Sequence, residues 1–182
     1  MSVESDASLQ ETSTTTEQIH AALSWLVSLL SRHNVPYQVV GGLAAQAYGA
    51  TRPLVDIDLY VPLDLAQAAV QEMRPFIVRE ALPHRSDSWD LVYLALDFHG
   101  VYIEIGDSST NPRFYDRLDQ RWEPQVIDYV ASTIVSLYGI DVAVMPREEL
   151  LRYKAMLDRE VDHWDIQAIA GAQPGVRERP SC

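Results

Sequence analysis

The sequence predicts an α+β (α/β-like) domain, in which a mixed β-sheet carries helices and is followed by a C-terminal helical pair. Two observations support this fold class. Segments with helical and strand-like periodicity alternate through the first half of the chain, and strand-like segments dominate the middle. Two further helical segments then end the pattern, an order typical of a sheet with helices packed on it.

The first half shows the alternation most clearly. Thr14-Thr15-Thr16-Glu17 matches a capping box, with Thr14 as the N-cap and Glu17 at N3, and apolar residues follow at helical spacing. The segment after Gly41-Gly42 is small and alanine-rich, which suits a helix packed close to a sheet. The expected elements are a helix over 14–34, a strand over 37–40, a helix over 43–48, a strand over 54–61 and a helix over 64–73 with Asp64 as its N-cap.

In the second half we expect two hairpins and two helices. The hairpins turn at His99-Gly100 and Tyr138-Gly139, and Pro146 suits the first position of a helix. Residues 1–13 are polar, acidic and without periodicity, so they predict a disordered tail, and 171–182 predict a flexible one, around a domain at 14–170. The expected elements are a strand over 76–82, a loop over 83–88, strands over 91–98 and 101–105, an irregular segment over 111–123, strands over 133–137 and 140–144, and helices over 146–157 and 161–170.

Composition limits the classes of function. A hydrophobic fraction of 47% with 22% charged residues is ordinary for a globular protein, and no apolar run approaches the roughly 20 residues that span a bilayer. No signal peptide is recognised, and Cys182 is the single cysteine, which excludes an intrachain disulfide. We therefore expect a cytoplasmic protein with no membrane partner. The net charge of −12 disfavours nucleic acid and favours a cationic small molecule, although a local basic groove stays open.

The run Leu54 to Val61 contains Asp56-Ile57-Asp58 within an alternating strand pattern. Successive side chains of a strand point to opposite faces, so both carboxylates should emerge together, with Val55, Ile57, Leu59 and Val61 toward the core. Two anionic groups side by side favour a divalent cation, and Mg²⁺ typically binds one or two carboxylates plus substrate phosphates. The alternative is a solvated strand edge that discourages aggregation.

Two further features bear on this choice. Glu104 lies in the alternating run Val101 to Ile105, and it joins Asp56 and Asp58 on one face if the two strands are neighbours. It would then ligate a metal or accept the proton of an attacking hydroxyl, with Asp107 as the runner-up for this third carboxylate and a wet hairpin face as the alternative. Gly41-Gly42, between a strand and a helix, allows close backbone approach to phosphate, or forms only a tight turn.

The string Val40-Gly41-Gly42, then thirteen residues, then Asp56-Ile57-Asp58-Leu59 resembles the signature of the DNA polymerase β-like nucleotidyltransferase superfamily. Thr51-Arg52 before the aspartates, and Asp162-His163-Trp164-Asp165-Ile166 near the end, resemble small antibiotic nucleotidyltransferases that act on lincosamides and aminoglycosides. The resemblance spans roughly 16–170, and its specific part is 40–61. It implies the nucleotidyltransferase fold.

Carried over by position, the resemblance assigns roles. Gly41 and Gly42 would cradle the nucleotide phosphates, Asp56 and Asp58 would bind one or two Mg²⁺ ions, and Glu104 would be the third carboxylate. Arg52 would contact phosphate in bidentate fashion and Lys154 would meet the triphosphate as a point charge, unless both are ordinary surface charges. The chain departs from the antibiotic-modifying relatives at Leu43, Gln46 and Glu104, where Trp, Asp and Asp are more usual; Leu43-Ala44-Ala45 looks closer to toxin-type nucleotidyltransferases.

These features predict an enzyme that moves a nucleoside monophosphate from an NTP to a hydroxyl group. ATP is the first expectation for the NTP, and another NTP is the alternative. The expected acceptor is a small cationic molecule such as an aminoglycoside- or lincosamide-like compound. The alternatives are a toxin-type enzyme acting on tRNA or protein, and a catalytically silent nucleotide-binding module. The oligomeric state stays open, as does completion of the site by a partner protein.

Other polar and aromatic residues rank lower as functional candidates. Asp162, His163 and Asp165 would form a metal cluster, or they cap and solvate the last helix, which is the favoured interpretation. His84 and His99 fall in expected loops or turns without an evident partner. Trp89, Trp122 and Trp164 are expected to be packing residues, with stacking of one of them on an acceptor or base as the alternative.

Overall fold

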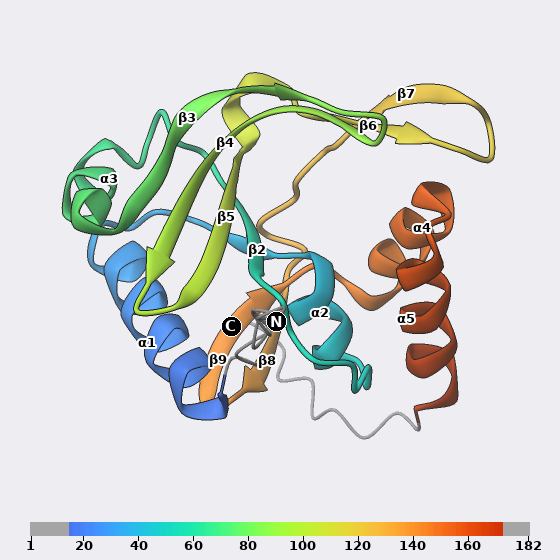
Figure 1. Ribbon diagram of the computed structural model, residues 1–182, viewed down its shortest axis with the longest axis horizontal. Helices are drawn as coiled ribbons and strands as arrows, with labels where there is room; N and C mark the ends of the chain where they lie inside the picture. Colours follow the sequence, from blue (N-terminus) through green and yellow to red (C-terminus); the bar gives the residue numbers. More distant parts are fainter. Residues whose placement is uncertain (1–14, 173–182) are drawn as a thin grey trace, which may run out of the picture.

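The computed structural model describes residues 15–172 and shows a curled mixed sheet flanked by helices (Figure 1). Within these residues the sheet has nine strands in the order β7-β6-β4-β5-β2-β1-β9-β8, and β3 pairs with β4 off this path. The strands are β1 (Gln38–Val39), β2 (Ile57–Val61), β3 (Ile77–Arg85), β4 (Trp89–Phe98), β5 (Val101–Asp107), β6 (Arg113–Asp116), β7 (Arg121–Pro124), β8 (Thr133–Leu137) and β9 (Ile140–Val144). The helices are α1 (Thr16–Arg32), α2 (Gly41–Ala47), α3 (Gln67–Met73), α4 (Arg147–Leu157) and α5 (Glu160–Gly171), with 3-10 turns η1 (Arg74–Phe76) and η2 (Ser108–Thr110).

The centre of the sheet is the parallel pair of β2 and β5. Ile57 is opposite Ile103 and Leu59 is opposite Ile105, and these four side chains are buried against the core. Helix α1 contacts β5 and β9 on this side of the sheet (Figure 1). Because side chains alternate along each strand, the other face of β2 and β5 is left for polar groups.

Helix α1 begins one residue later than the sequence predicted. Thr15 is the N-cap, and Gln18 at N3 completes the capping box by accepting from the Thr15 backbone N–H. Thr14 lies outside the described residues, and Glu17 is a first-turn residue that makes no capping contact in this box. The shift follows from chemistry, because an amide oxygen at N3 fills the capping role as well as a carboxylate. The apolar face is as expected, with Ile19, Leu23, Leu26 and Leu30 buried.

Both predicted hairpins are confirmed: β4 and β5 turn at His99-Gly100, and β8 and β9 turn at Tyr138-Gly139. The C-terminal helical pair is confirmed as α4 and α5, which stand together at one side of the molecule and face α2 (Figure 1). Pro146 is the N-cap of α4 rather than its first residue. Across residues 15–172, none of the helices combines the length and apolar character that a membrane crossing needs.

The segment 111–123, expected to be irregular, forms most of β6 and β7. Tyr115 lies opposite Trp122 with their rings 5.5 Å apart, and Arg121 pairs with Asp119 and Glu123. An aromatic pair across the strands, and ion pairs within β7 and its turn, stabilise a ribbon without an apolar alternation, which is why the hydrophobic pattern did not reveal it.

Three smaller predictions on the strands and helices are also corrected. Strand β3 continues to Arg85, through part of the expected loop, because residues 83–85 pair with β4. Asp64 does not cap α3, which begins three residues later with Ala66 as the N-cap. Val55 is 74% exposed, because it precedes β2 and the alternation does not reach it. The predicted tail at 1–13 and residues 173–182 of the other tail lie outside the described residues.

Candidate active site

Three carboxylates meet on the open face of the central strands. Asp58 on β2 is the direct register partner of Glu104 on β5, and Asp56 lies one residue before β2. The pKa of Asp58 is raised to about 8, mainly by burial and then by the negative charges of Asp56 and Glu104, against opposing contributions from Lys154 and Arg159. Burial and the Asp56 charge likewise raise the pKa of Glu104. The face therefore concentrates negative charge that the surrounding protein compensates only in part.

Asp107, the runner-up for the third carboxylate, belongs to the opposite side of β5. It is the register partner of Val61, whose side chain is fully buried. The Asp107 carboxylate accepts hydrogen bonds from the backbone N–H groups of Leu63 and Ser109 at 3.1 and 3.0 Å, and from the Ser109 hydroxyl at 2.6 Å. Asp107 thus caps η2, and the register groups Glu104, rather than Asp107, with Asp58.

The glycine pair lies against the aspartates. Gly41 has φ +64°, and a Cβ built on it would be 2.1 Å from Oδ2 of Asp58. A Cβ on Gly42 would be 2.7 Å from Nη2 of Arg52. Since a real Cβ does not approach so closely, glycine is required at both positions for the backbone turn to lie beside Asp58 and Arg52.

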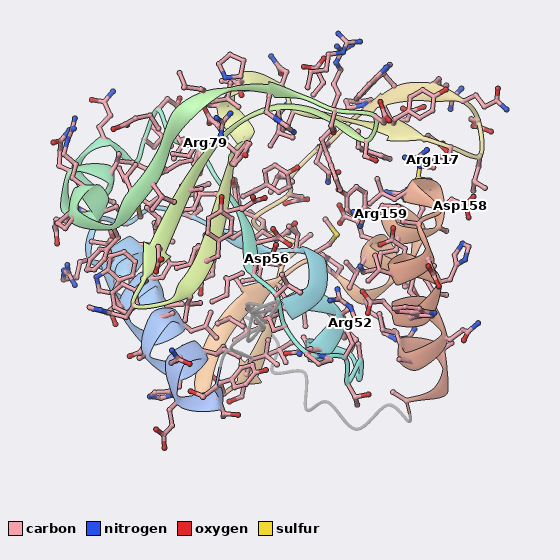
Figure 2. All side chains as sticks on the ribbon, viewed as in Figure 1. Arg52, Asp56, Arg79, Arg117, Asp158 and Arg159 are labelled. Atoms are coloured by element: carbon pink, nitrogen blue, oxygen red, sulfur yellow. The ribbon has the colours of Figure 1, made fainter. Side chains whose placement is uncertain are left out.

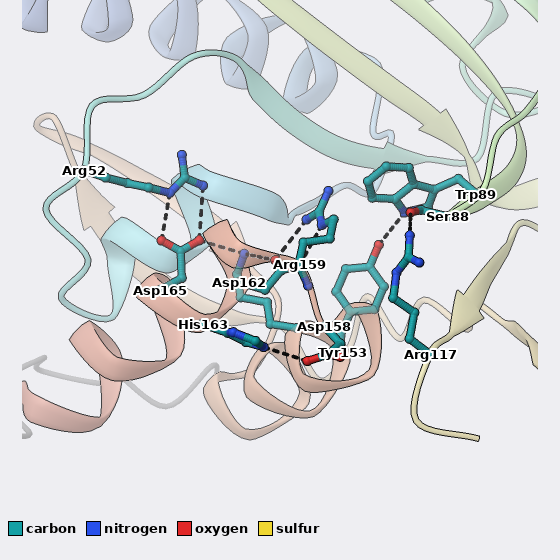
Figure 3. Close-up of polar contacts among 11 residues, drawn as sticks. Arg52, Ser88, Trp89, Arg117, Tyr153, Asp158, Arg159, Asp162, His163 and Asp165 are labelled. Atoms are coloured by element: carbon teal, nitrogen blue, oxygen red, sulfur yellow. Dashed lines mark hydrogen bonds and ion pairs between the residues drawn. The ribbon is translucent and has the colours of Figure 1, made fainter. Parts of the chain in front are cut away.

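Arg52 and Lys154 are held by buried acids of the C-terminal helix (Figure 3). Arg52 donates to both carboxylate oxygens of Asp165, from Nε at 2.8 Å and from Nη2 at 3.1 Å. Nζ of Lys154 lies 2.8 Å from Asp165 and 3.2 Å from Asp162. The Lys154 side chain is 2% exposed, so Lys154 is not the ordinary surface charge that the sequence left as an alternative.

Arg159 is a third cation at this wall, and sequence reasoning missed it. Its guanidinium donates to both oxygens of Asp162, at 2.6 and 2.9 Å, and lies 4.7 Å from the ring centroid of Trp89. Its charge contributes to lowering the pKa of Asp56 and Asp58. The spacing of Arg159 and Asp162 at i and i+3 was the available signal, since such pairs meet on one side of a helix.

Asp162 and Asp165 therefore form buried ion pairs with these cations. The sequence-based interpretation that they solvate α5 is wrong. Asp162 does have the expected capping role, because it also accepts the backbone N–H of Arg159. His163 points elsewhere, with Nε2 2.6 Å from the exposed Asp158 (Figure 3). Among residues 15–172, no group of three or more His, Cys, Asp or Glu side chains is arranged to hold a metal ion alone.

The three tryptophans and two histidines that the sequence analysis singled out have different surroundings in the structure. Trp89 Nε1 donates to the Tyr153 hydroxyl at 2.8 Å and so links β4 to α4 (Figure 3). Trp122 packs against Tyr115, but Trp164 is 56% exposed and is not the packing residue that was expected. His99 packs against Phe76 and Phe98, whereas His84 lies on β3 beside Tyr93. Trp89 and Tyr153, and likewise Phe76 and His99, come from segments distant in sequence, so no local pattern revealed these two contacts.

A pocket with a volume of about 520 Å³ joins these groups. One side is formed by the glycine turn and by the C-terminal helices, and the other by β3, β4 and β5. The lining residues are Val40, Gly41, Gly42, Arg52, Val55, Asp56, Asp58, Leu59, Tyr60, His84, Trp89, Leu91, Tyr93, Glu104, Gly106, Tyr153, Lys154, Arg159 and Val161. The pocket thus places three acids, three cations and a set of aromatic rings around one cavity.

No protein-family model matches the sequence, and neither does a curated protein. Solved structures are similar to it. A Thermotoga maritima protein assigned to the nucleotidyltransferases is 19% identical, with a TM-score of 0.60 over 75% of this chain and 83% of that one. The lincosamide antibiotic adenylyltransferase LnuA, bound to lincomycin, is 16% identical, with a TM-score of 0.55 over 83% and 96% of the two chains. ANT(2″)-Ia in complex with adenylyl-2″-tobramycin is 14% identical, with a TM-score of 0.54 over 86% and 88%.

At these identities the likeness concerns the fold. The chain has the nucleotidyltransferase fold, which the sequence resemblance predicted, with the mixed sheet, the flanking helices and the C-terminal helical pair in place.

Proposed function

We propose that this protein is a metal-dependent nucleotidyltransferase, which moves AMP from ATP to a hydroxyl group of a small acceptor and releases pyrophosphate. The observation that carries the proposal is the pairing of Asp58 with Glu104 on adjacent strands, with Asp56 beside them and the Gly41-Gly42 turn against Asp58. Three acids lie beside the glycine pair, in a pocket of the nucleotidyltransferase fold, and this arrangement favours phosphoryl-transfer chemistry over a solvated strand edge.

The acids fit a divalent cation with oxygen ligands. The pKa values of Asp56, Asp58 and Glu104 are all raised, chiefly by burial, so the positive charges of Arg52, Lys154, Arg159 and Arg79 compensate only part of the cost of ionising these acids. Asp56 and Asp58 would hold Mg²⁺, with substrate phosphates supplying further oxygens, as Mg²⁺ sites with few carboxylates commonly have. The bound metal would neutralise charge that develops on the phosphate oxygens.

The triphosphate would bind at the cationic wall, which consists of Arg52, Lys154 and Arg159. Gly41 and Gly42 would allow close backbone approach, and Arg52, Lys154 and Arg159 would face the phosphates that leave as pyrophosphate. Asp162 and Asp165 fix these cations before substrate arrives, which reduces the ordering that binding must supply.

Glu104 would act on the acceptor. Its carboxylate would accept the proton of the acceptor hydroxyl as that oxygen forms a bond to the α-phosphorus, while the bond from the α-phosphorus to the pyrophosphate oxygen breaks. In an in-line displacement the attacking and leaving oxygens lie on opposite sides of the phosphorus. Glu104 comes from β5, whereas Lys154 comes from α4 and Arg159 is the N-cap of α5, and we expect these groups to serve opposite sides of the phosphorus.

For the acceptor, the structural neighbours provide the starting compounds. LnuA is described with lincomycin and ANT(2″)-Ia with adenylyl-2″-tobramycin, so a hydroxylated antibiotic-like molecule is the first class to examine. The net charge of −12 was the sequence argument for a cationic acceptor. A tRNA or protein acceptor, and a catalytically silent module, are alternatives without a favouring observation in residues 15–172.

Calorimetry of Mg²⁺-dependent ATP binding tests the proposal. Wild type is compared with the double variant Asp56→Asn/Asp58→Asn, and Asp141→Asn on β9 is the matched control outside the pocket. Metal-dependent binding in the wild type and the control, lost in the double variant, is expected. Absence of binding of ATP or any other NTP by wild type would refute the transferase assignment.

A further inference from the structure

The pocket has two chemically different flanks on either side of Asp58. On one flank the lining cations Arg52, Lys154 and Arg159 come from the loop before β2 and from the C-terminal segment. On the other flank the lining residues come from β3, β4 and β5. In Figure 2, Asp56 lies between Arg79 on the sheet side and Arg52 and Arg159 on the helix side. Assigning one flank to the acceptor rests on the proposed function.

Charge assigns the flanks. The triphosphate is the most anionic part of the substrates, and the three cations can neutralise it only on the helix side. Since an in-line displacement keeps the attacking oxygen opposite the leaving group, the acceptor must enter from the side of β5, β4 and β3. Glu104, the carboxylate proposed to accept its proton, is on that side.

The sheet flank is aromatic and apolar rather than acidic. Tyr93 and Leu91 line it from β4, and His84 on β3 contacts the Tyr93 ring edge-on at 5.4 Å between centroids. The register explains why Tyr93 is there: it is the partner of Gly106 on β5, two residues from Glu104, so the two side chains share a face. Among the described residues lining the pocket from these three strands, Glu104 is the one carboxylate.

A cation is held over this aromatic surface. The Arg79 guanidinium lies 4.2 Å from the centroid of the Tyr93 ring and donates to the Leu82 carbonyl at 3.2 Å. Asp90, the acid at the start of β4, is engaged by Arg113 and Arg85 instead and does not line the pocket. Arg79 does not line the pocket either, but its positive charge acts on Glu104 and opposes the rise in the pKa of that side chain. With one carboxylate on this flank and a cation behind it, the flank is a poor environment for a molecule with several ammonium groups.

We infer that the acceptor is an amphipathic hydroxyl compound that lays an apolar or ring face on Tyr93, Leu91 and His84 and carries no more than one positive charge. This narrows the acceptor that the net charge of −12 suggested, because the lining of the pocket holds as many cations as acids. The negative charge of the whole chain acts at longer range and is screened within about 10 Å at 0.1 M salt.

Initial rates with saturating Mg²⁺ and ATP test the inference, with two probes that both carry hydroxyls. Lincomycin is the amphipathic probe and tobramycin the polycationic one. Wild type should prefer lincomycin by at least tenfold in kcat/KM. Tyr93→Ala should raise the KM for lincomycin by roughly tenfold, through lost apolar contact, and leave the KM for ATP unchanged. Tyr115→Ala, on the β6–β7 ribbon outside the pocket, is the matched control and should change neither.

A gain of function gives an independent measurement. Leu91→Glu adds a carboxylate to the sheet flank and should shift the lincomycin-to-tobramycin ratio toward tobramycin by roughly tenfold. Leu118→Glu, at a position 62% exposed and outside the pocket, adds the same charge to the chain and should leave the ratio unchanged. Thermal unfolding of each variant verifies that it is folded.

The outcomes separate this inference from the proposed function. Preference for tobramycin, binding of neither probe by calorimetry while ATP binds, or a raised KM for ATP in Tyr93→Ala would each overturn the acceptor assignment and leave nucleotidyl transfer standing. The last result would mean that the aromatic surface holds the nucleobase. Failure of wild type to bind ATP with Mg²⁺ would remove the proposed function, and the acceptor assignment with it.

Discussion

Asp58 on β2 and Glu104 on β5 are direct partners in a parallel strand pair, so their carboxylates project from one face of the sheet. Burial raises the pKa of both side chains, and nearby negative charge raises it further, from Asp56 and Glu104 at Asp58 and from Asp56 at Glu104. Such an arrangement reduces the stability of the fold unless a positively charged ligand neutralises the acids. Acids of this kind are typical of functional sites rather than of structural ones.

Asp58→Asn should lower the rate of nucleotidyl transfer by a factor of about a thousand or more, and the protein should stay folded. The pKa of about 8 means that Asp58 is mostly protonated at pH 7 in the absence of metal, so the amide replaces a neutral group. We therefore expect the free energy of unfolding to change by less than about 1 kcal/mol. Pyrophosphate release and urea denaturation, measured on one preparation, check both parts. Retained turnover would show that Asp58 is not needed for the chemistry.

The two candidates for the third carboxylate are separated by a pair of variants. Glu104→Gln should reduce kcat strongly and leave the unfolding midpoint in urea close to wild type. Asp107→Asn should keep activity and lower stability by about 1–2 kcal/mol, because an amide oxygen accepts the bonds from Leu63 and Ser109 less well than a carboxylate. The reverse pattern would assign the role to Asp107.

The carboxylates were within reach of sequence reasoning because strand periodicity decides which side chains share a face. Asp56, Asp58 and Glu104 needed only that β2 and β5 be neighbours, and the structure makes them so. The glycine pair was accessible for a similar reason, although it forms the first two residues of α2, just after β1, rather than a loop before a helix that begins at residue 43.

The pairing of Arg159 with Asp162 had a local signal, but the positions of Arg159, Trp89 and Tyr153 around the pocket depend on contacts between distant segments and could not be predicted. Trp89 meets Tyr153 across 64 residues, and the cationic wall forms only when α5 packs beside the loop that carries Arg52. The ribbon of β6 and β7 was missed for another reason: an aromatic pair across its strands, with ion pairs along β7, replaces the hydrophobic alternation on which sequence reasoning relies.

Gly41→Ala and Gly42→Ala should weaken metal-dependent ATP binding by roughly tenfold or more. At Gly41 a methyl group would collide with the Asp58 carboxylate, and φ of +64° adds strain; at Gly42 it would displace the Arg52 guanidinium. Calorimetry measures the affinity. Gly171→Ala near the end of α5 is the matched control, because its methyl group would meet nothing within 4 Å. Equal affinity in all three variants would argue against a phosphate cradle at the glycine turn.

Arg159→Gln should weaken ATP binding, and Arg152→Gln should not. Arg159 lines the pocket beside the carboxylates, whereas Arg152 lies on the exposed side of α4 outside the pocket. A charge-assisted contact to phosphate contributes about 1.5–3 kcal/mol, which corresponds to a loss of roughly ten- to a hundredfold in affinity. Titration of both variants with Mg²⁺ and ATP checks the difference. Equal affinities would show that Arg159 only supports the fold.

Asp162 should make the protein sensitive to acid. Burial raises the pKa of this carboxyl, but hydrogen bonds and charge from Arg159, with Lys154, outweigh burial and hold the pKa below its usual 3.8. A folded-state pKa below the unfolded value means that the ionised pair stabilises the protein above about pH 4, and that this stability is lost as the pH falls through the folded-state pKa. Urea denaturation of wild type at pH 7 and pH 3 should therefore show a fall in the free energy of unfolding.

Asp162→Asn separates this contribution from the other carboxylates. At pH 7 the variant should lose about 3 kcal/mol, because Lys154 is buried and keeps only Asp165 as an acidic partner, and its fall toward pH 3 should be smaller than in wild type. Asp158→Asn is the control, since Asp158 pairs with the exposed His163 at the surface, where an ion pair contributes little. An Asp162→Asn protein with wild-type stability and an unchanged acid dependence would mean that the cations of the pocket wall are held in place by Asp165 alone.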